Sequence, residues 1–273
     1  MKNTKQNLHT HSVYCDGKDT PEQLIDFARA QGFGSLGFSG HSWADYSALR
    51  SVITPERTEE YKKKITALKA QYGEEFPVFL GLEVDMYSGV DQSGYDYLIG
   101  SVHYLKLGEE YLPFDHTPEE MRKLIRERFG GSGMTMAKHY FEAVAQLPRY
   151  GTFDIIGHFD LVTKNLYAEP FFDDTSKEYL SAALEAIHAL RGKIPLFEVN
   201  TGAMAKGTRN LPYPALPLMR EFRELGFGAV IASDCHDGRK LDCGFETARE
   251  LLEACGFRER YILTDHGFEA VAL

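Results

Sequence analysis

The feature that most constrains the fold is the alternation of short apolar runs with helical patterns along the 273 residues. Three helices begin in the same way, with a threonine cap, a proline at the first helical position and a glutamate in the first turn, after Thr20, Thr54 and Thr117. Further helical patterns cover residues 135–147, 175–191, 214–225 and 245–255. Strands separated by helices predict an α/β protein with a parallel sheet.

Seven apolar segments are predicted to be the strands. They are residues 7–11, 35–41, 77–85, 95–103, 153–160, 195–202 and 228–236. Seven strands with helices between most of them, in a chain of one-domain length, favour a closed or nearly closed barrel over an open sheet. We therefore expect a single domain over residues 1–273. The longest irregular segment, 161–176, follows the fifth strand and is expected to be a loop over the barrel mouth.

Composition narrows the classes of partner. Thirty basic against forty acidic residues give a net charge of −10, which disfavours general binding to nucleic acid. A small anion can still bind where metal ions or a basic pocket reverse the local field. Four cysteines without a CxxC pair, no apolar signal segment and no membrane-length apolar run predict a cytoplasmic protein without a membrane partner. The oligomeric state is left open.

Polar side chains with metal-binding chemistry fall at successive strand ends. These are His9 and His11, with Asp16 shortly after them, and then His41, Glu83, His103, His158, Asp234 and His236. The carboxyl ends of the strands carry the active site in parallel α/β barrels, so these side chains should converge. A single strand-end histidine is commonly bonded to a backbone carbonyl, but six of the ten histidines follow this pattern.

A cluster of metal ions is the physical interpretation of this pattern. Residues two apart on a strand face the same side, so His9 and His11 can bind one ion together. Mixed imidazole and carboxylate ligands suit Zn²⁺, Mn²⁺ or Fe, and nine ligands suffice for two to three divalent ions, particularly if Glu83 bridges. Three such ions carry about +6, and three carboxylates and a bridging hydroxide leave about +2, which matches a phosphate monoester dianion.

The motifs at these strand ends resemble the polymerase and histidinol phosphatase (PHP) family over nearly the whole chain. They are "HTH" followed by Asp16, "GH" at 40–41, "GLEVD", "GSVH", "GHFD" and "ASDCH". The segments "DLVTKN" and "EVNTGAMAKGTRNLPYP" resemble more narrowly the stand-alone histidinol-phosphate phosphatases. The resemblance implies a distorted (β/α)7 TIM-like barrel with a trinuclear metal site at the C-terminal ends of the strands.

The resemblance also implies a division of the ligands among three ions. The first ion is held by His9, His11, Glu83 and Asp234, the second by Glu83 as a bridge with His103 and His158, and the third by Asp16, His41 and His236. The implied activity is a metal-dependent phosphomonoesterase that hydrolyses L-histidinol phosphate to L-histidinol and phosphate, through a metal-bridging hydroxide.

Residues facing the substrate are predicted from charge and position. Lys164, Lys206 and Arg209 follow the fifth and sixth strand ends, and we expect them to bind the phosphate or orient the leaving alcohol; solvated loop cations are the alternative. Relatives often carry arginine where Lys206 stands, and lysine keeps the charge but loses the bidentate geometry. Asp160 and Asp85, two residues after His158 and Glu83, are each predicted to donate a proton to the leaving group or to orient a ligand, and Asp160 is the favoured proton donor.

Four alternatives to histidinol phosphate hydrolysis stay open. A second small phosphate ester, such as a nucleotide or sugar phosphate, would use the same chemistry. A metal-dependent amidohydrolase also begins with HxH, but commonly uses a lysine bridge and eight strands. A metal-storing barrel and a nucleic-acid exonuclease are disfavoured by the complete ligand set and by the acidic charge, respectively. Among the other polar residues, we expect His116 to have a loop role and Cys15 to be a bystander.

Overall fold

Seven strands form one parallel sheet in the computed structural model, which describes residues 3–47 and 51–273. The spatial order is β1-β2-β3-β4-β7-β8-β9, so neighbours in the sheet also follow one another along the chain. The strands are β1 (Gln6–Asn7), β2 (Ser35–Phe38), β3 (Val78–Asp85), β4 (Tyr97–Ser101), β7 (Ile155–Ile156), β8 (Leu196–Asn200) and β9 (Gly228–Ala232).

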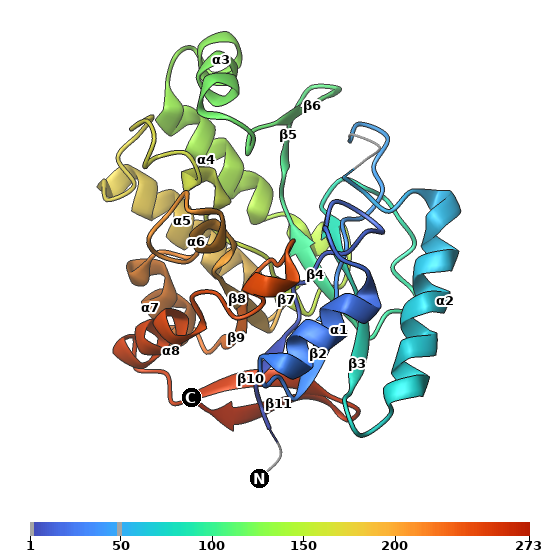
Figure 1. The fold of residues 1–273 in the computed structure, drawn as a ribbon. Helices are drawn as coiled ribbons and strands as arrows, with labels where there is room; N and C mark the ends of the chain where they lie inside the picture. The colour runs from blue at the N-terminus through green and yellow to red at the C-terminus, as the bar shows by residue number, and fades with distance from the viewer. Residues whose placement is uncertain (1–2, 48–50) are drawn as a thin grey trace.

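The two ends of this sheet meet just beyond β1 and β9. Thr10 and Cys235 form a parallel bridge. The backbone N–H of His11 donates to the carbonyl of Cys235 at 2.8 Å, and the N–H of Cys235 donates to the carbonyl of His9 at 3.0 Å. The sheet is therefore a nearly closed barrel of seven strands surrounded by helices (Figure 1), which confirms the predicted fold class.

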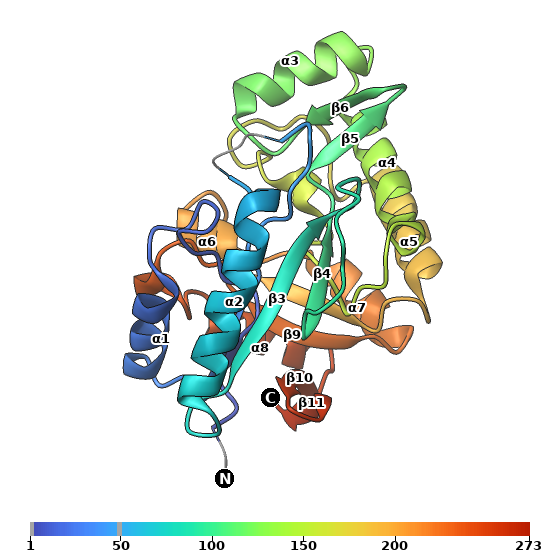
Figure 2. The ribbon, with the colours of Figure 1, turned by 90° about the vertical axis from the view of Figure 1, so that its right-hand side faces the viewer.

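Helices pack around the outside of the barrel and lie near their predicted positions. They are α1 (Pro21–Ala30), α2 (Pro55–Tyr72), α3 (Pro118–Arg128), α4 (Gly133–Val144), α5 (Lys177–Leu190), α7 (Leu216–Glu224) and α8 (Phe245–Ala254). Thr20 and Thr117 each form the reciprocal cap with the third helical residue, whereas the Thr54 side chain makes no capping hydrogen bond. Figure 2 shows α2 lying along β3. Within the described residues, no helix is long and apolar enough to span a membrane.

Two hairpins and one short helix were not predicted. A hairpin of β5 (Tyr104–Leu107) and β6 (Glu110–Pro113) follows β4, and the short helix α6 (Gly202–Lys206) follows β8. A second hairpin, β10 (Glu259–Thr264) and β11 (Gly267–Ala272), ends the chain. The two hairpins lie at opposite ends of the barrel in both views (Figures 1 and 2). Leu263 of β10 packs into the apolar interior of the barrel, so the second hairpin closes the end away from the strand C-termini.

Two strands are much shorter than predicted. The first and fifth predicted strands, 7–11 and 153–160, shrink to two residues each in the structure. The chain beyond Asn7 and beyond Ile156 leaves regular pairing and carries His9, His11 and His158 toward the centre of the barrel mouth. The predicted strands were too long because the residues after Asn7 and Ile156 remain buried but make no regular strand pairing.

Candidate metal centre

All nine predicted ligands meet at the C-terminal ends of the strands and are called here the histidine–carboxylate cluster. Glu83, near the end of β3, is at its centre and is fully buried. Its Oε1 lies 2.9 Å from Nε2 of His158 and 3.3 Å from Nε2 of His103. Its Oε2 lies 2.8 Å from Nδ1 of His41 and 3.2 Å from Nε2 of His9. One carboxylate thus contacts imidazoles from four different segments.

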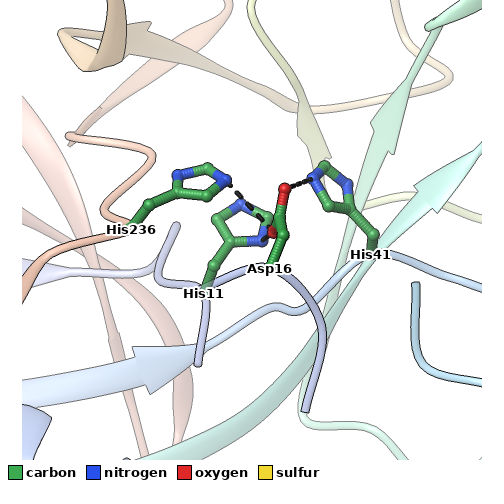
Figure 3. Close-up of side chains that lie close together, drawn as sticks. All are labelled: His11, Asp16, His41 and His236. Carbon is green, nitrogen blue, oxygen red and sulfur yellow. Dashed lines mark ion pairs between the residues drawn. The ribbon is translucent and has the colours of Figure 1, made fainter. Parts of the chain in front are cut away.

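Two more carboxylates extend the cluster on the side of His11. Asp234 Oδ1 lies 3.1 Å from Nε2 of His11 and 3.4 Å from Nδ1 of His236. Asp16 lies among three imidazoles (Figure 3): its Oδ1 is 3.2 Å from Nε2 of His236 and 3.7 Å from Nδ1 of His11, and its Oδ2 is 3.7 Å from Nε2 of His41. His11 therefore faces both carboxylates through its two ring nitrogens.

Three groups of side chains are close enough to hold an ion each. They are His9, His11 and Asp234; His41, Glu83 and His103; and His11, Asp16, His41 and His236. These groups overlap the three predicted ligand sets. They differ in that His11 and His41 each belong to two groups, whereas each belongs to one predicted set. His158 joins the second group through its 2.9 Å contact with Glu83.

Unpaired buried atoms test whether a cation fits here. Nε2 of His9, Nε2 of His11 and Oε2 of Glu83 are buried and make no well-aligned hydrogen bond within the described part of the chain, although Oε2 lies 2.8 Å from Nδ1 of His41. Buried polar atoms are normally paired because leaving one unpaired costs about 1–3 kcal/mol. The three atoms face one another, so a divalent cation would satisfy all of them at once, and the donor set fits Zn²⁺, Mn²⁺ or Fe.

Protonation also agrees with a cation site. Burial and the neighbouring His236 and His41 lower the pKa of His11 to about 3, so its imidazole is neutral and can donate a lone pair. Burial alone would raise the pKa of Glu83, but the surrounding imidazoles, His9 foremost, hold it well below its usual range. For His9, burial alone would lower the pKa, but the neighbouring carboxylates, Glu198 foremost, outweigh burial and raise it. Uptake of a cation should therefore release a proton from His9.

Asp234 adopts an uncommon backbone conformation. Among residues 3–47 and 51–273, it is the non-glycine residue with a positive φ, 47°. Such conformations cost of order 1–3 kcal/mol and cluster at functional sites. The carbonyl of Asp234 accepts a hydrogen bond from Nδ1 of His236 at 2.9 Å. The turn therefore aims the Asp234 carboxylate and the His236 ring into the same cluster.

Two outer carboxylates hold ligand histidines: Asp85, which was predicted to orient a ligand or to donate a proton, and Glu198, which was not predicted. Oε2 of Glu198, on β8, accepts from Nδ1 of His9 at 2.8 Å. Oδ2 of Asp85 accepts the backbone N–H of His103 at 3.1 Å and lies 3.4 Å from its Nδ1, while Oδ1 accepts from the Tyr46 hydroxyl at 2.6 Å. A carboxylate behind a metal-binding histidine orients the ring. The available signal was that both follow apolar strand residues on the predicted barrel face.

A cavity of about 240 Å³ opens beside the cluster. Two of the three predicted cations line it. Lys206 Nζ lies 3.9 Å from Asp234 Oδ2, and Lys164 Nζ lies 3.0 Å from Oδ2 of Asp115. His116 also lines this cavity, so its loop position places it against the site. Asp115 was not predicted, because a single acidic residue before a helix cap gives no signal of its own.

Arg209 and Asp160 lie outside the lining residues. Nη1 of Arg209 donates to the carbonyl of Thr163 at 3.2 Å and also contacts its hydroxyl, and the guanidinium lies 4.6 Å from the ring centre of Tyr213. Asp160 is fully buried, which raises its pKa, and its Oδ2 accepts the N–H of Ala215 at 3.0 Å. Both residues brace segments that carry the cavity wall.

The predicted bystander Cys15 contacts a predicted ligand. Its Sγ lies 3.5 Å from Nδ1 of His11. Burial raises the pKa of the Cys15 thiol to about 12, so it stays protonated at neutral pH. A protonated thiol is a poor metal ligand, which leaves packing against the His11 ring as its observed contact.

Comparison with known families identifies the family of this chain. The model of the PHP domain matches residues 7–202. The chain belongs to the PHP family. The match includes seven of the nine cluster residues and ends before Asp234 and His236.

Curated relatives of this PHP protein match over nearly their whole length. A probable histidinol-phosphatase of Deinococcus radiodurans is 29% identical over 265 residues, covering 92% of this chain and 93% of the relative. A histidinol-phosphatase of Bacillus subtilis is 26% identical, with 92% and 99% covered. The crystal structure of histidinol phosphate phosphatase from Lactococcus lactis, complexed with zinc, L-histidinol and phosphate, is 20% identical, with a TM-score of 0.74 over 97% of this chain and 99% of that one. This last likeness shows the shared barrel.

Proposed function

We propose that this PHP protein is a metal-dependent phosphomonoesterase that hydrolyses L-histidinol phosphate to L-histidinol and phosphate. The observation that carries the proposal is the histidine–carboxylate cluster, with its unpaired buried donors, beside a cavity lined by Lys164 and Lys206. The curated relatives support the choice of substrate, because they are named histidinol-phosphatases or probable histidinol-phosphatases and they match more than nine-tenths of this chain.

Two to three divalent ions, Zn²⁺, Mn²⁺ or Fe, are the proposed cofactors. The resemblance gives the ligand sets: His9, His11, Glu83 and Asp234; Glu83, His103 and His158; and Asp16, His41 and His236. Their mutual distances in the structure support these sets. Ions bound there would supply positive charge for the phosphoryl oxygens and lower the pKa of water. The complex of the Lactococcus lactis enzyme with zinc favours Zn²⁺ among the three.

The protein's own residues would divide the remaining work. The ammonium groups of Lys164 and Lys206 line the cavity and would bind phosphate oxygens as point charges. Asp160 and Arg209 would act from behind the lining. Arg209 holds Thr163, which immediately precedes Lys164, and Asp160 holds the backbone just after the Tyr213 wall. Asp160 does not line the cavity, and Tyr213 does, so a proton from Asp160 would have to pass Tyr213 to reach the leaving alcohol. We therefore favour an orienting role for Asp160.

A second small phosphate ester is the alternative substrate. A cavity of about 240 Å³ beside the cluster also suits other small phosphate esters. Membership of the PHP family and seven strands in place of eight make an amidohydrolase less favoured. We also propose that residues 1–273 are one PHP-type domain, since the C-terminal hairpin packs into the barrel core.

Phosphate release from L-histidinol phosphate by the zinc-loaded protein tests the proposal, beside nucleotides, sugar phosphates and amides. Histidinol phosphate should be the preferred substrate, with kcat/KM at least tenfold above the rest. His103→Asn should abolish turnover. His188→Asn is the matched control and should not, because His188 is exposed on α5 and pairs with Glu221. Turnover of another ester in preference would refute the substrate, and turnover of amides alone would refute the chemistry.

A further inference from the structure

We propose that Glu198 is a positioning residue that fixes the His9 ring with its hydrogen on Nδ1 and so presents Nε2 to a metal ion. The inference rests on the proposed metal centre and assigns a role to a residue outside the nine ligands. Glu198 lies on β8, has no exposed surface, and is not among the residues that line the cavity.

Three N–H groups converge on the Glu198 carboxylate. Oε2 lies 2.8 Å from Nδ1 of His9. Oε1 accepts the backbone N–H of His158 at 2.7 Å and the Nδ2 amide of Asn200 at 2.7 Å. One side chain therefore ties a ligand ring from the β1 end to the backbone of a second ligand at the β7 end. Both strands are two residues long and are not neighbours in the sheet, so this link joins two ends that strand pairing does not connect.

The choice of ring hydrogen follows from the acceptor. A carboxylate accepts hydrogen bonds, so Nδ1 of His9 must carry the hydrogen in this contact. In the neutral ring, the form that binds an ion, Nε2 then has a free lone pair. Nε2 is the atom that lies 3.2 Å from Glu83 Oε2 and 3.8 Å from Asp234 Oδ1 without a hydrogen-bond partner. A histidine that binds a metal commonly donates its other N–H to a carboxylate, which raises ligand basicity and fixes the ring.

An amide at position 198 would reverse this arrangement. In Glu198→Gln, one orientation keeps the oxygen facing His158 and Asn200 and directs the NH2 group at Nδ1 of His9. The ring must then accept there and carry its hydrogen on Nε2, the atom intended for the ion. The other orientation faces the NH2 group with two N–H donors. A carboxylate that only filled space would tolerate this isosteric change.

Competition between metal-free protein and a chromogenic zinc chelator tests the role. Zinc affinity of Glu198→Gln should fall ten- to hundredfold, with the content of bound zinc per chain reduced at limiting zinc. Asp154→Asn is the matched control. Asp154 accepts the Leu98 N–H at 2.8 Å and immediately precedes β7, at the far end of that strand from His158, so its affinity should equal that of the wild type. Zinc affinity of Glu198→Gln within twofold of the wild type would overturn the proposal.

A measurement on the wild-type protein keeps the test decisive if the variant fails to fold. Long-range ¹H–¹⁵N correlation of the histidine rings in the zinc-loaded protein, with His9 assigned by substitution, should show the hydrogen on Nδ1. A hydrogen on Nε2 of His9 would overturn the proposal. A wild-type chain that takes up no zinc would refute this role together with the proposed function, whereas zinc uptake unaffected by Glu198→Gln refutes this role alone.

Discussion

The glycine at the start of α6 gives a test of how closely the cluster is built. A Cβ atom on Gly202 would lie 2.8 Å from Cβ of Asp234 and 2.9 Å from its Oδ2. Gly202 does not have a positive φ, so alanine is compatible with the backbone and the contact alone decides the outcome. Carbon atoms pack at about 3.5–4.0 Å, so Gly202→Ala must displace the Asp234 side chain or α6 by roughly 0.7 Å or more.

The displacement is large compared with what a metal site tolerates. Ligand distances in such sites hold to about ±0.2 Å, and Asp234 cannot turn aside freely because its φ is already positive and its carboxylate faces His11 at 3.1 Å. Overpacking typically costs about 1–3 kcal/mol of stability. We therefore expect Gly202→Ala to lower the free energy of unfolding of the metal-free protein by that amount and to lower zinc affinity at least tenfold, or about 1.4 kcal/mol.

Chelator competition and urea denaturation separate the two effects. Gly133→Ala is the control: its Cβ would collide with the backbone carbonyl of Phe171, away from the cluster. It should cost stability without changing zinc affinity. Gly202→Ala with wild-type zinc affinity would show that α6 moves instead of Asp234, and would refute the reasoning.

Four further outcomes are expected. Lys206→Ala should raise KM about tenfold in steady-state assays. This effect is smaller than the loss of a fully buried charged contact would cause, because the Lys206 side chain is 43% exposed. Lys206→Arg should restore binding. Arg209→Ala should leave KM within twofold but lower the free energy of unfolding in urea by about 1–3 kcal/mol, since its contacts are to Thr163 and Tyr213. Burial alone would raise the pKa of Asp115, but the Lys164 ammonium outweighs it and the pKa falls to about 2. The resulting stability is present above pH ~4 and lost as the pH falls toward 2, so Asp115→Asn should remove about 2 kcal/mol of this pH dependence in denaturation curves; parallel curves would contradict it. Removing zinc from protein loaded at a hundred times Kd should cost about 2.7 kcal/mol, seen as a lower Tm in calorimetry.

The predictable part of this molecule is the part governed by local pattern. Capped helix starts at Thr20 and Thr117 and apolar runs such as 77–85 predict α1, α3 and β3 almost to the residue, because capping and burial act within a few positions. The convergence of the nine candidate ligands could be predicted because the carboxyl ends of parallel strands lie together, whatever the loops between them do. The two hairpins were missed because their strands are mixed in polarity and only one face of each packs.

Residues that act through hydrogen bonds to distant parts of the chain could not be predicted from the sequence. Glu198 meets His9 across 189 positions, and nothing near Glu198 in the sequence distinguishes a carboxylate that faces an imidazole from one that faces solvent. Arg209 and Lys206 were predicted with the same role because both are cations after the same strand. The structure separates them because Arg209 stacks on Tyr213 behind the wall, while Lys206 reaches the cavity.

The charge at the barrel mouth depends more on whether metal ions occupy the cluster than on the charged side chains of the protein. The protein carries a net charge of −10, and Asp16, Glu83 and Asp234 place three negative charges among the imidazoles of the cluster. His11 is held neutral, but burial is outweighed by the carboxylates, which raise the pKa of His9, His41 and His103, so protons on these rings offset the negative charge in the metal-free protein. Lys164 and Lys206 alone cannot reverse that field, because each already faces a carboxylate. We therefore expect a phosphate dianion to bind well only when divalent ions replace the imidazole protons of the cluster. An ion held by Asp234 would also free Lys206 for the phosphate, whereas Lys164 stays paired with Asp115, outside the cluster. The acidic composition and the proposed anionic substrate are compatible for this reason.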